Sequence, residues 1–350
     1  MIRTAIVGGT GYTGLELVRL LAGHPQAELC AISARTAAGQ PVAECFPSLR
    51  GHCDLVFCAP EEIDFAAVDL VFFATPHGVA QASVPQALAA GARVIDLSAD
   101  FRLRDPALWQ RWYGQPHQCP ELLAEAVYGL PEIARAEIAK ARLVACPGCY
   151  PTAIQLGLLP LLRRNNPPHP PPINLQTLIA NAASGVTGAG RQAKVDNLFA
   201  ELADSFKAYA VAGHRHLPEI EQGLQDLARA PVALTFVPHL LPVNRGILAT
   251  IYADLAPGTA ADVRQLYDNA FAAEPFVDLL PPGQQPSLRA VRGTNRCQIA
   301  IEKPQDRNRL VITAAIDNLV KGAAGQALQN MNIMGGLPEA SGLQTAALIP

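Results

Sequence analysis

The turn that joins the first two predicted elements constrains the fold more than any other feature of the sequence. The β-branched apolar run RTAIV (residues 3–7) leads directly into GGTGYTG (8–14), and LELVRLLAG (15–23) follows with helical spacing and a terminal glycine. An apolar strand, a tight glycine turn and a helix in this order are typical of a parallel sheet covered by helices. The N-terminal part of the chain is therefore predicted to be α/β.

The same alternation of apolar strands and helices continues through the first 149 residues. RLVAC (142–146) is predicted to be the last strand of this unit; the other predicted strands lie at 27–33, 68–74 and 92–99, with a helix at 79–91. Strands that are apolar throughout and alternate with helices are buried on both faces of a sheet. We therefore predict a Rossmann-type, doubly wound domain over residues 1–149.

The pattern changes after Cys149. A helix is expected from Pro151, and basic residues followed by a proline run at 163–172 predict a rigid surface connection. Partly alternating, β-branched runs then predict strands at 173–181, 232–241, 246–255, 297–303 and 309–317, with helices near 216–229 and 260–273. This predicts an α+β domain with a mostly antiparallel sheet over 150–317, and a C-terminal helix over about 318–350 that rejoins the first domain.

Composition and charge exclude several classes of protein. The chain has 350 residues, a net charge of -3 and 16% charged residues, without the basic face of a nucleic-acid-binding protein or the long apolar run of a membrane protein. The N-terminus becomes glycine-rich too early for a signal peptide, so a cytoplasmic protein is expected. The eight cysteines are then expected to be free thiols.

The glycine turn is a candidate dinucleotide site. Gly8, Gly11 and Gly14 have the spacing GxxGxxG between a predicted strand and a predicted helix. Glycine there permits a tight turn and a close approach of the backbone to a pyrophosphate, and the amides at the helix start favour negative charge. The cofactor is predicted to contact the whole turn, which also contains Gly9, Thr10, Tyr12 and Thr13.

The end of the second predicted strand indicates which dinucleotide binds. A site that prefers NAD usually has Asp or Glu there to bind the ribose 2′-hydroxyl, but this chain has Ser33 and Arg35. A hydroxyl and a guanidinium suit a 2′-phosphate, which a carboxylate would repel. The sequence therefore predicts NADP(H).

Cys146 and Cys149 in ACPGCYPT form a CxxC pair, which could be a metal clip, a redox pair or a nucleophile with a bystander. A structural zinc site needs four ligands, and the only comparable partner is the HxH pair His214 and His216, so no metal site is predicted. A thioredoxin-like pair would open a helix close behind the first strand of its fold. We favour Cys149 as the nucleophile, while an inert buried thiol stays open for Cys149 and is the favoured interpretation of Cys146.

A cysteine at a helix start suits one reaction class when a nicotinamide is present. Pro151 fits the first turn of a helix, so Cys149 lies at or just before the helix N-terminus, where partial positive charge stabilises a thiolate. A thiolate can capture an activated acyl group as a thioester, which then accepts hydride to give an aldehyde. Direct reduction of a free carboxylate lacks this activation.

Eight motifs in sequence order resemble the N-acetyl-gamma-glutamyl-phosphate reductase family over about residues 2–335. They are GGTGYTGLELVRLL, VIDLSADFRL, YGLPE, PGCYPTA, SGVTGAGR, GHRHLPEI, FVPHLLPVNRGILATIY and DNLVKGAAGQALQNMN. The resemblance implies NADPH-dependent reduction of N-acetyl-glutamyl 5-phosphate to the 5-semialdehyde, with Cys149 as nucleophile and a histidine of GHRH as acid/base. His214 is preferred over His216. It also implies a homodimer or homotetramer. One departure is Cys146, where many members have Asn, which makes Cys146 a possible oxidation partner.

The remaining motifs supply candidates for binding the substrate and the nicotinamide. A substrate with a carboxylate and a phosphate needs fixed cations, and the candidates are Arg102, Arg191, Arg215 and Arg245, each of which could instead form a structural salt bridge. Ser184, Gly185 and Asn318 are candidates for the cofactor end of the site; for the KGAAGQ segment after Asn318, tight helix packing is an equal alternative. Rival functions are an aspartate-semialdehyde dehydrogenase-type reductase of another acyl phosphate and a non-catalytic NADP-binding sensor.

Overall fold

The computed structural model of the chain describes residues 1–163, 170–259 and 262–348 and divides into two compact units. The first unit contains Met1–Gly148 with Ala323–Thr345, and the second contains Cys149–Gly322 with the last residues of the chain. The proline-rich connection expected at 163–172 falls mostly on residues outside the described ranges.

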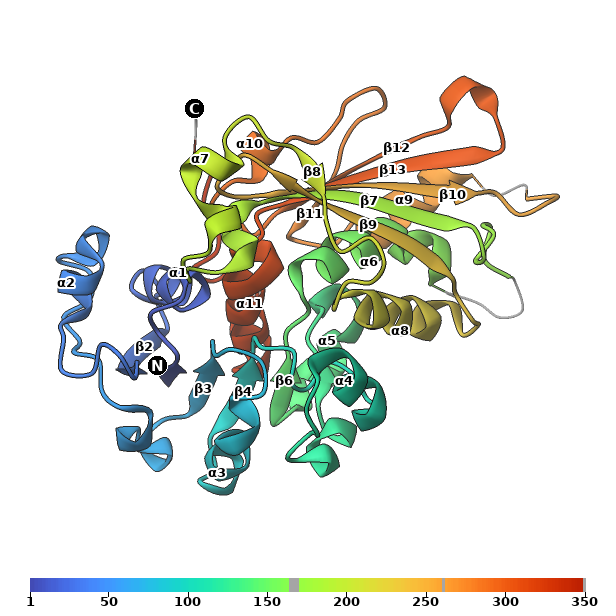
Figure 1. Ribbon diagram of the computed structural model, residues 1–350. Helices are drawn as coiled ribbons and strands as arrows, with labels where there is room; N and C mark the ends of the chain where they lie inside the picture. Colours follow the sequence, from blue (N-terminus) through green and yellow to red (C-terminus); the bar gives the residue numbers. More distant parts are fainter. Residues whose placement is uncertain (164–169, 260–261, 349–350) are drawn as a thin grey trace. The chain divides into compact units, whose positions relative to one another are not determined.

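The first unit is built on a six-stranded sheet in the order β2-β1-β3-β4-β6-β5, and its pairings are all parallel. Its strands are β1 (Ile2–Val7), β2 (Ala27–Ser33), β3 (Leu70–Phe73), β4 (Arg93–Asp96), β5 (Val127–Tyr128) and β6 (Leu143–Ala145). Its α-helices are α1 (Tyr12–Leu21), α2 (Val42–Cys45), α3 (Val84–Ala89), α4 (Pro106–Tyr113), α5 (Pro131–Lys140) and α11 (Gly325–Met334). The predicted Rossmann-type sheet is confirmed (Figure 1).

The strand order of this sheet places the glycine turn at a ligand-binding position. β1 has β2 on one side and β3 on the other, so the order of strands reverses at the carboxyl end of β1. Open α/β sheets bind ligands at such a switch point. The glycine turn that follows β1 therefore lies where a dinucleotide would be expected.

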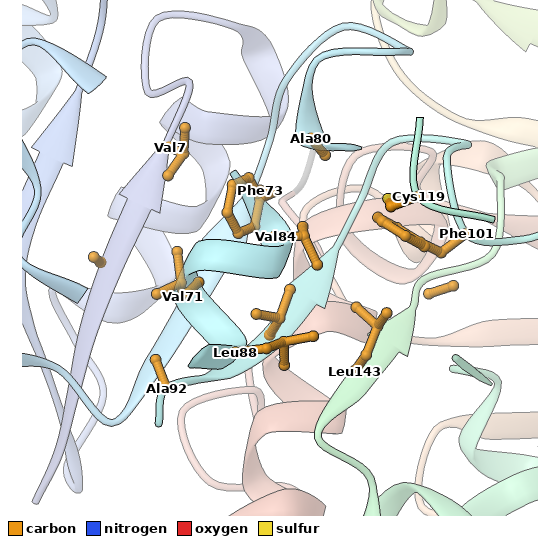
Figure 2. Packing of buried hydrophobic residues seen from close by; sticks show 14 of the residues in the cluster. Val7, Val71, Phe73, Ala80, Val84, Leu88, Ala92, Phe101, Cys119 and Leu143 are labelled. Carbon is orange, nitrogen blue, oxygen red and sulfur yellow. The ribbon is translucent and has the colours of Figure 1, made fainter. Parts of the chain in front are cut away.

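The core of the first unit explains why β3 is apolar at every position. β3 is buried at every position, as a parallel strand between two layers of helices must be. Figure 2 shows Val84 and Leu88 of α3 on the same side of the sheet as Val71 and Phe73. Because side chains of a strand alternate between faces, Leu70 and Phe72 point to the opposite layer.

The C-terminal helix α11 lies beside α1 and α5 in the first unit (Figure 1). It is shorter than the range 318–350 expected from the sequence, because Gly335 and Gly336 follow its last turn and Pro338 comes soon after. Gly336 has φ +65°, a left-handed conformation that ends a helix easily.

The second unit contains a seven-stranded sheet in the order β11-β12-β13-β10-β7-β9-β8. Its strands are β7 (Leu178–Gly185), β8 (Lys207–Ala208), β9 (Leu234–Leu241), β10 (Ile247–Asp254), β11 (Val277–Leu279), β12 (Cys297–Glu302) and β13 (Arg309–Ile316). The pairs β7–β9 and β11–β12 are parallel and the other pairings are antiparallel, so the predicted mostly antiparallel sheet is confirmed. The α-helices are α6 (Cys149–Leu162), α7 (Phe199–Leu202), α8 (Leu217–Ala228), α9 (Val263–Phe271) and α10 (Leu288–Val291).

Helix α6 is the central helix of the second unit. It packs on β10 and β13 and is flanked by α8 and α9 (Figure 1). Every residue of α6 after its first is buried, and Gly157 permits close packing, since an added Cβ would lie 2.8 Å from Cδ1 of Ile251. The helix begins at Cys149, two residues before the expected start, because Pro151 fits inside the first turn, where its missing N–H is not needed.

Candidate active site

The glycine turn after β1 is shaped by close packing at three glycines. Gly8 has φ +93°, and an added Cβ would lie 2.7 Å from the carbonyl oxygen of Ala74. A Cβ on Gly14 would lie 2.7 Å from the carbonyl oxygen of Gly8, and one on Gly9 would overlap a side chain of β2. At Gly11, the N-cap of α1, an added Cβ meets nothing within 4 Å. The turn is therefore closed towards the sheet and open at the helix start, where amides favour an anion.

The two residues predicted to bind a 2′-phosphate lie in different surroundings at the end of β2. Ser33 is fully buried, and its carbonyl accepts hydrogen bonds from the amides of Gly8 at 3.2 Å and Gly9 at 2.8 Å. Arg35 is exposed. Ser33 thus fixes the glycine turn through its backbone, while Arg35 presents a cation at the surface. The other residues of the turn, Thr10, Tyr12 and Thr13, are half-buried.

Thr75 is a candidate ligand-binding residue that the sequence did not reveal, because no motif surrounds it. It follows β3, and its Cγ2 lies 3.2 Å from the position that a Cβ on Gly8 would take. Its Oγ1 is buried and has no hydrogen-bond partner among the described residues, and the same holds for Oγ of Ser33. Buried hydroxyls normally have partners. Two such hydroxyls near an open helix start fit a polar ligand such as a dinucleotide.

Cys149 is the first residue of α6 and is half-buried. The first turn of a helix has amides without intrahelical partners, and the helix dipole adds partial positive charge there. Both effects favour a thiolate over a thiol. The sequence-based expectation placed Cys149 at or just before a helix start, and this is where it lies.

The two histidines of GHRH lie in the turn before α8 and not on a strand, so an HxH pair on one face of a strand does not form. His216 is the N-cap residue of α8, and its backbone N–H donates a hydrogen bond of 3.0 Å to Nδ1 of His214. The two rings are 4.9 Å apart. This bond leaves Nε2 as the ring nitrogen of His214 that can carry the proton of the neutral imidazole.

Aromatic rings enclose His214 within the second unit. Its ring centroid lies 5.5 Å from that of Tyr150, 5.7 Å from that of Tyr209 and 5.5 Å from that of Phe236. Tyr150 directly follows Cys149 on α6, so the enclosure brings His214 to the start of that helix. Tyr150 and Tyr209 were not predicted from the sequence: Tyr150 is hidden inside the cysteine motif, and Tyr209 lies in a segment without any motif.

The electrostatics of this cluster follow from burial. Burial and, to a smaller extent, the positive charge of Arg215 lower the pKa of His214 to about 4, so the imidazole is neutral at pH 7. The two tyrosine hydroxyls lie 2.9 Å apart. Burial raises the pKa of Tyr209 to about 12; burial also raises the pKa of Tyr150, and a negative charge on Cys149 contributes to both increases. Cys149 therefore lies near two hydroxyls that stay protonated at pH 7.

A network of hydrogen bonds holds the segment that follows β7. Oγ of Ser184 donates to the carbonyl of Gly185 at 3.0 Å, and the amide of Gly185 donates to the carbonyl of Gly246 at 2.9 Å. Oδ1 of Asn318 accepts from the amide of Gly246 at 2.6 Å, and Nδ2 of Asn318 donates to Oγ1 of Thr187 at 3.0 Å. Ser184, Gly185 and Asn318, which were predicted to contact the cofactor, are thus connected to one another within the second unit.

The side chain of Arg102 forms a hydrogen bond to the backbone of Cys146 inside the first unit. Nε of Arg102 donates to the carbonyl of Cys146 at 2.7 Å, and Nη2 donates to the carbonyl of Leu97 at 2.9 Å. Both side chains are buried. Burial raises the pKa of the Cys146 thiol to about 12, and Nδ2 of Asn330 lies 3.5 Å from its sulfur. Cys146 therefore remains a thiol at pH 7, whereas Arg102 holds the end of β6.

The other three arginines predicted to bind substrate differ in their surroundings. Arg245 forms a bidentate pair with Asp317, with Nε 3.0 Å from Oδ2 and Nη2 3.1 Å from Oδ1. Asp317 is fully buried and the side chain of Arg245 is 22% exposed. Arg191 and Arg215 are exposed at the surface of the second unit.

Among the described residues, no group of three or more His, Cys, Asp or Glu side chains is arranged to hold a metal ion. In the same ranges, none of the helices has both the length and the apolar character needed to cross a membrane.

Two family models match the chain. The model of the semialdehyde dehydrogenase NAD binding domain matches residues 3–141. The model of the semialdehyde dehydrogenase dimerisation domain matches residues 149–318. The second match begins at the first residue of α6.

The fold resembles solved structures of aspartate semialdehyde dehydrogenases. Enzyme II from Vibrio cholerae, complexed with ASA, superposes with a TM-score of 0.73 and 16% identity, covering 96% of this chain and 98% of that chain. The enzyme from Candida albicans with NADP superposes with a TM-score of 0.70 and 15% identity, covering 96% and 98%. At these identities the likeness concerns the fold alone.

Relatives of much higher identity match the chain over its full length. The N-acetyl-gamma-glutamyl-phosphate reductase of Saccharophagus degradans is 58% identical over 353 residues, and that of Cellvibrio japonicus is 57% identical over 354 residues; each match covers 100% of both chains. The resemblance predicted from the eight motifs is thereby confirmed. The chain belongs to the N-acetyl-gamma-glutamyl-phosphate reductase family.

Proposed function

We propose that the protein reduces N-acetyl-L-glutamyl 5-phosphate to N-acetyl-L-glutamate 5-semialdehyde with release of phosphate, as a step of arginine biosynthesis, using NADPH and a thioester on Cys149. The observation that carries the proposal is the start of α6. There a half-buried cysteine lies near two protonated tyrosines and a neutral histidine, in a chain of this reductase family.

Cys149 and His214 would divide the chemistry between them. Cys149 would lose its proton to solvent and attack the acyl carbon as the thiolate that the start of α6 stabilises, so that a C–S bond forms as the C–O bond to phosphate breaks. Because Nδ1 of His214 already accepts the amide of His216, the Nε2–H of His214 would donate a hydrogen bond to the departing phosphate oxygen, and the phosphate takes up a proton from solvent. The thioester would accept hydride from a reduced nicotinamide, when one is bound, and become a tetrahedral oxyanion. Collapse of this oxyanion breaks the C–S bond, releases the aldehyde and restores the thiolate.

The hydroxyls of Tyr150 and Tyr209 would support the charged states of this reaction. Because their pKa values are raised, both hydroxyls stay protonated at pH 7, and since one of them donates to the other, the second proton is the one available to a nearby negative charge. Donors that are already oriented towards a developing negative charge stabilise it without reorganisation. We infer that they stabilise the thiolate before acylation and after collapse of the oxyanion.

The glycine turn and Arg35 would hold NADP(H). The pyrophosphate would meet the open start of α1 at Gly11, and the exposed guanidinium of Arg35 would pair with the 2′-phosphate. Replacing Arg35 by Asp should shift the ratio of kcat/KM for NADPH over NADH towards NADH by at least about tenfold, since a carboxylate repels the 2′-phosphate. An unchanged ratio would remove Arg35 from the cofactor site.

Arg191 and Arg215 are the proposed contacts for the phosphate and the carboxylate of the substrate. Both are exposed, and Arg215 lies between the two histidines of the acid/base turn. Arg102 and Arg245 donate to backbone carbonyls and to Asp317, respectively, and are proposed to act structurally within their own units. We propose that the nicotinamide end of the cofactor contacts Ser184, Gly185 and Asn318.

The proposal is tested by comparing the two cysteines. Cys149→Ser should abolish turnover, because a hydroxyl does not replace the thiolate in forming and releasing the acyl intermediate, whereas Cys146→Ser should retain it. Cys146 is the matched control because it lies three residues away and is held as a thiol by burial. Turnover by Cys149→Ser with loss in Cys146→Ser would reverse the assignment.

A second candidate is favoured by the fold, which is shared with aspartate semialdehyde dehydrogenases. Such an enzyme would use the same thioester chemistry on a different acyl phosphate. Assays of the reverse reaction with phosphate and NADP should show a kcat/KM at least about a hundredfold higher for N-acetylglutamate semialdehyde than for aspartate semialdehyde. A protein that binds NADP but turns over neither aldehyde would instead be a sensor.

A further inference from the structure

The chain after β13 passes directly beside Cys149 through a turn of unusual geometry. Val320–Ala324 forms a π-helical turn, a rare form that is frequently found at functional sites. Gly322 in this turn is so close to the cysteine that an added Cβ would lie 2.7 Å from Cβ and 3.2 Å from Cα of Cys149. No positive φ accompanies Gly322, so contact with Cys149, and not backbone conformation, is what requires glycine at this position.

Asp317 builds the turn that carries Gly322. Its backbone carbonyl accepts a hydrogen bond of 3.0 Å from the amide of Gly322, five residues on, which is the spacing of a π-helix. Its side-chain Oδ1 accepts from the amides of Leu319 at 2.8 Å and Val320 at 3.2 Å. One residue therefore satisfies the first amides of the turn and also sets its widened geometry.

Two further groups hold the Asp317 carboxylate in place. Arg245 pairs with it through Nε and Nη2, and the amide of Gly293 donates to Oδ2 at 2.7 Å. The carboxylate is fully buried. A buried charge that is paired and hydrogen-bonded on several sides is held rigidly, because leaving any partner unsatisfied is costly.

We propose that Asp317 and Gly322 are positioning residues for the nucleophile. Asp317 holds the π-helical turn rigidly, and this turn fixes the position of Cys149 through the contact with Gly322. This inference rests on the proposed function of Cys149. The π-helical turn contacts Cα and Cβ of the cysteine, and a small displacement of these atoms would move the sulfur away from the helix start and from His214. Neither Asp317 nor Gly322 is proposed to bind the substrate.

The direct test is Gly322→Ala, with Gly23→Ala as the matched control because an added Cβ at Gly23 meets nothing within 4 Å and no positive φ is present. For Gly322→Ala, kcat should fall about a hundredfold while KM for the acyl phosphate changes less than about threefold, as expected for a misplaced reacting group. The rate of alkylation of Cys149 by iodoacetamide, measured on its peptide by mass spectrometry, should fall at least about fivefold. Gly23→Ala should resemble the wild type in all three measurements. A Gly322→Ala protein with wild-type kcat and alkylation rate would overturn the proposal.

A double-mutant cycle on stability tests the contact itself and requires no catalysis. In the wild-type background Gly322→Ala should lower Tm by at least about 4 °C. In a Cys149→Gly background, which lacks the Cβ that the alanine would meet, the same substitution should lower Tm by less than half as much. Equal decreases in both backgrounds would show that Cys149 is not what Gly322 accommodates.

The two measurements separate the failure of this inference from the failure of the proposed function. If Cys149→Ser retained turnover, the thioester mechanism would be wrong, although the Tm coupling between positions 149 and 322 would persist. If Cys149→Ser were inactive but Gly322→Ala were normal in kcat and alkylation, the mechanism would stand and the positioning role would be wrong.

Discussion

Burial and the positive charge of Arg215 together keep the histidine at position 214 neutral. Its ring is enclosed by Tyr150, Tyr209 and Phe236, and water is largely replaced by hydrocarbon and phenol. Burial disfavours the charged imidazolium, so the ring stays neutral with its proton on Nε2. This Nε2–H can donate a hydrogen bond to a negative charge, which couples His214 to the charged states of the proposed reaction.

The lowered pKa of His214 predicts a pH-dependent contribution to stability. Between about pH 4 and pH 6.5 the unfolded chain binds a proton at this histidine that the folded chain does not, so the free energy of unfolding rises with pH in this window. His214→Gln should remove up to about 1.4 kcal/mol per pH unit of that rise. Urea unfolding followed by circular dichroism from pH 4 to pH 7 measures it. The exposed His52 supplies the control substitution His52→Gln; identical pH slopes for His214→Gln and the wild type would contradict the assignment.

At the scale of elements, the glycine turn combines packing and ligand binding at different glycines. Gly14 meets backbone atoms of Gly8 and Gly9, which cannot move aside, whereas Gly11 faces open space at the helix start. Spacing alone does not separate these roles, because both glycines belong to the same GxxGxxG pattern.

Two alanine substitutions should separate the two roles. Gly14→Ala should lower Tm by several degrees, since its Cβ would lie 2.7 Å from the carbonyl oxygen of Gly8. Gly11→Ala should leave Tm within about 2 °C of the wild type but weaken NADPH binding at least about tenfold, because its Cβ occupies the space that the pyrophosphate needs. Thermal unfolding and fluorescence titration with NADPH report the two effects. Unaltered NADPH affinity in Gly11→Ala would argue against a pyrophosphate at this helix start.

The elements were largely predictable because their signals are local. Apolar runs predicted most strands of both sheets, but not the short strands β5, β8 and β11, and the proline at 151 predicted that Cys149 lies at a helix start. The surroundings of Cys149 were not predictable in the same way, because they depend on contacts between segments far apart in the sequence, such as Tyr209 with Tyr150 and Asp317 with Arg245. Likewise, the burial of Ser33 depends on how β2 packs, which its strand pattern does not specify.

At the scale of the whole molecule, the seven-stranded sheet has one face covered by α6 and a second face that is only half-buried. Residues of the second face alternate along the strands and include Ile179 on β7, Tyr252 on β10 and Val311 on β13. Tyr252 lies opposite both Ile179 and Val311 in the sheet register. A row of apolar side chains that is left half-buried in this way is a candidate interaction site, and we expect a second copy of the chain to cover it.

A charge placed in the middle of this face should separate the copies. Tyr252→Arg should convert a wild-type dimer or tetramer to a smaller species in light scattering after size-exclusion chromatography, because an unpaired buried charge is costly at an interface. Ala90→Arg introduces the same charge at the exposed end of α3 and serves as the control. If Tyr252→Arg kept the wild-type mass, the subunits would have to associate through another surface.

The covalent step on Cys149 is the claim on which the proposed reaction depends. Mixing the protein with N-acetyl-glutamyl 5-phosphate in the absence of NADPH, followed by acid quench and peptide mass spectrometry, tests it directly. We expect the peptide that contains Cys149 to carry an N-acetylglutamyl thioester, which disappears when NADPH is added before the quench. An unmodified Cys149 peptide from protein that turns over substrate, or an adduct on Cys146 alone, would contradict the mechanism.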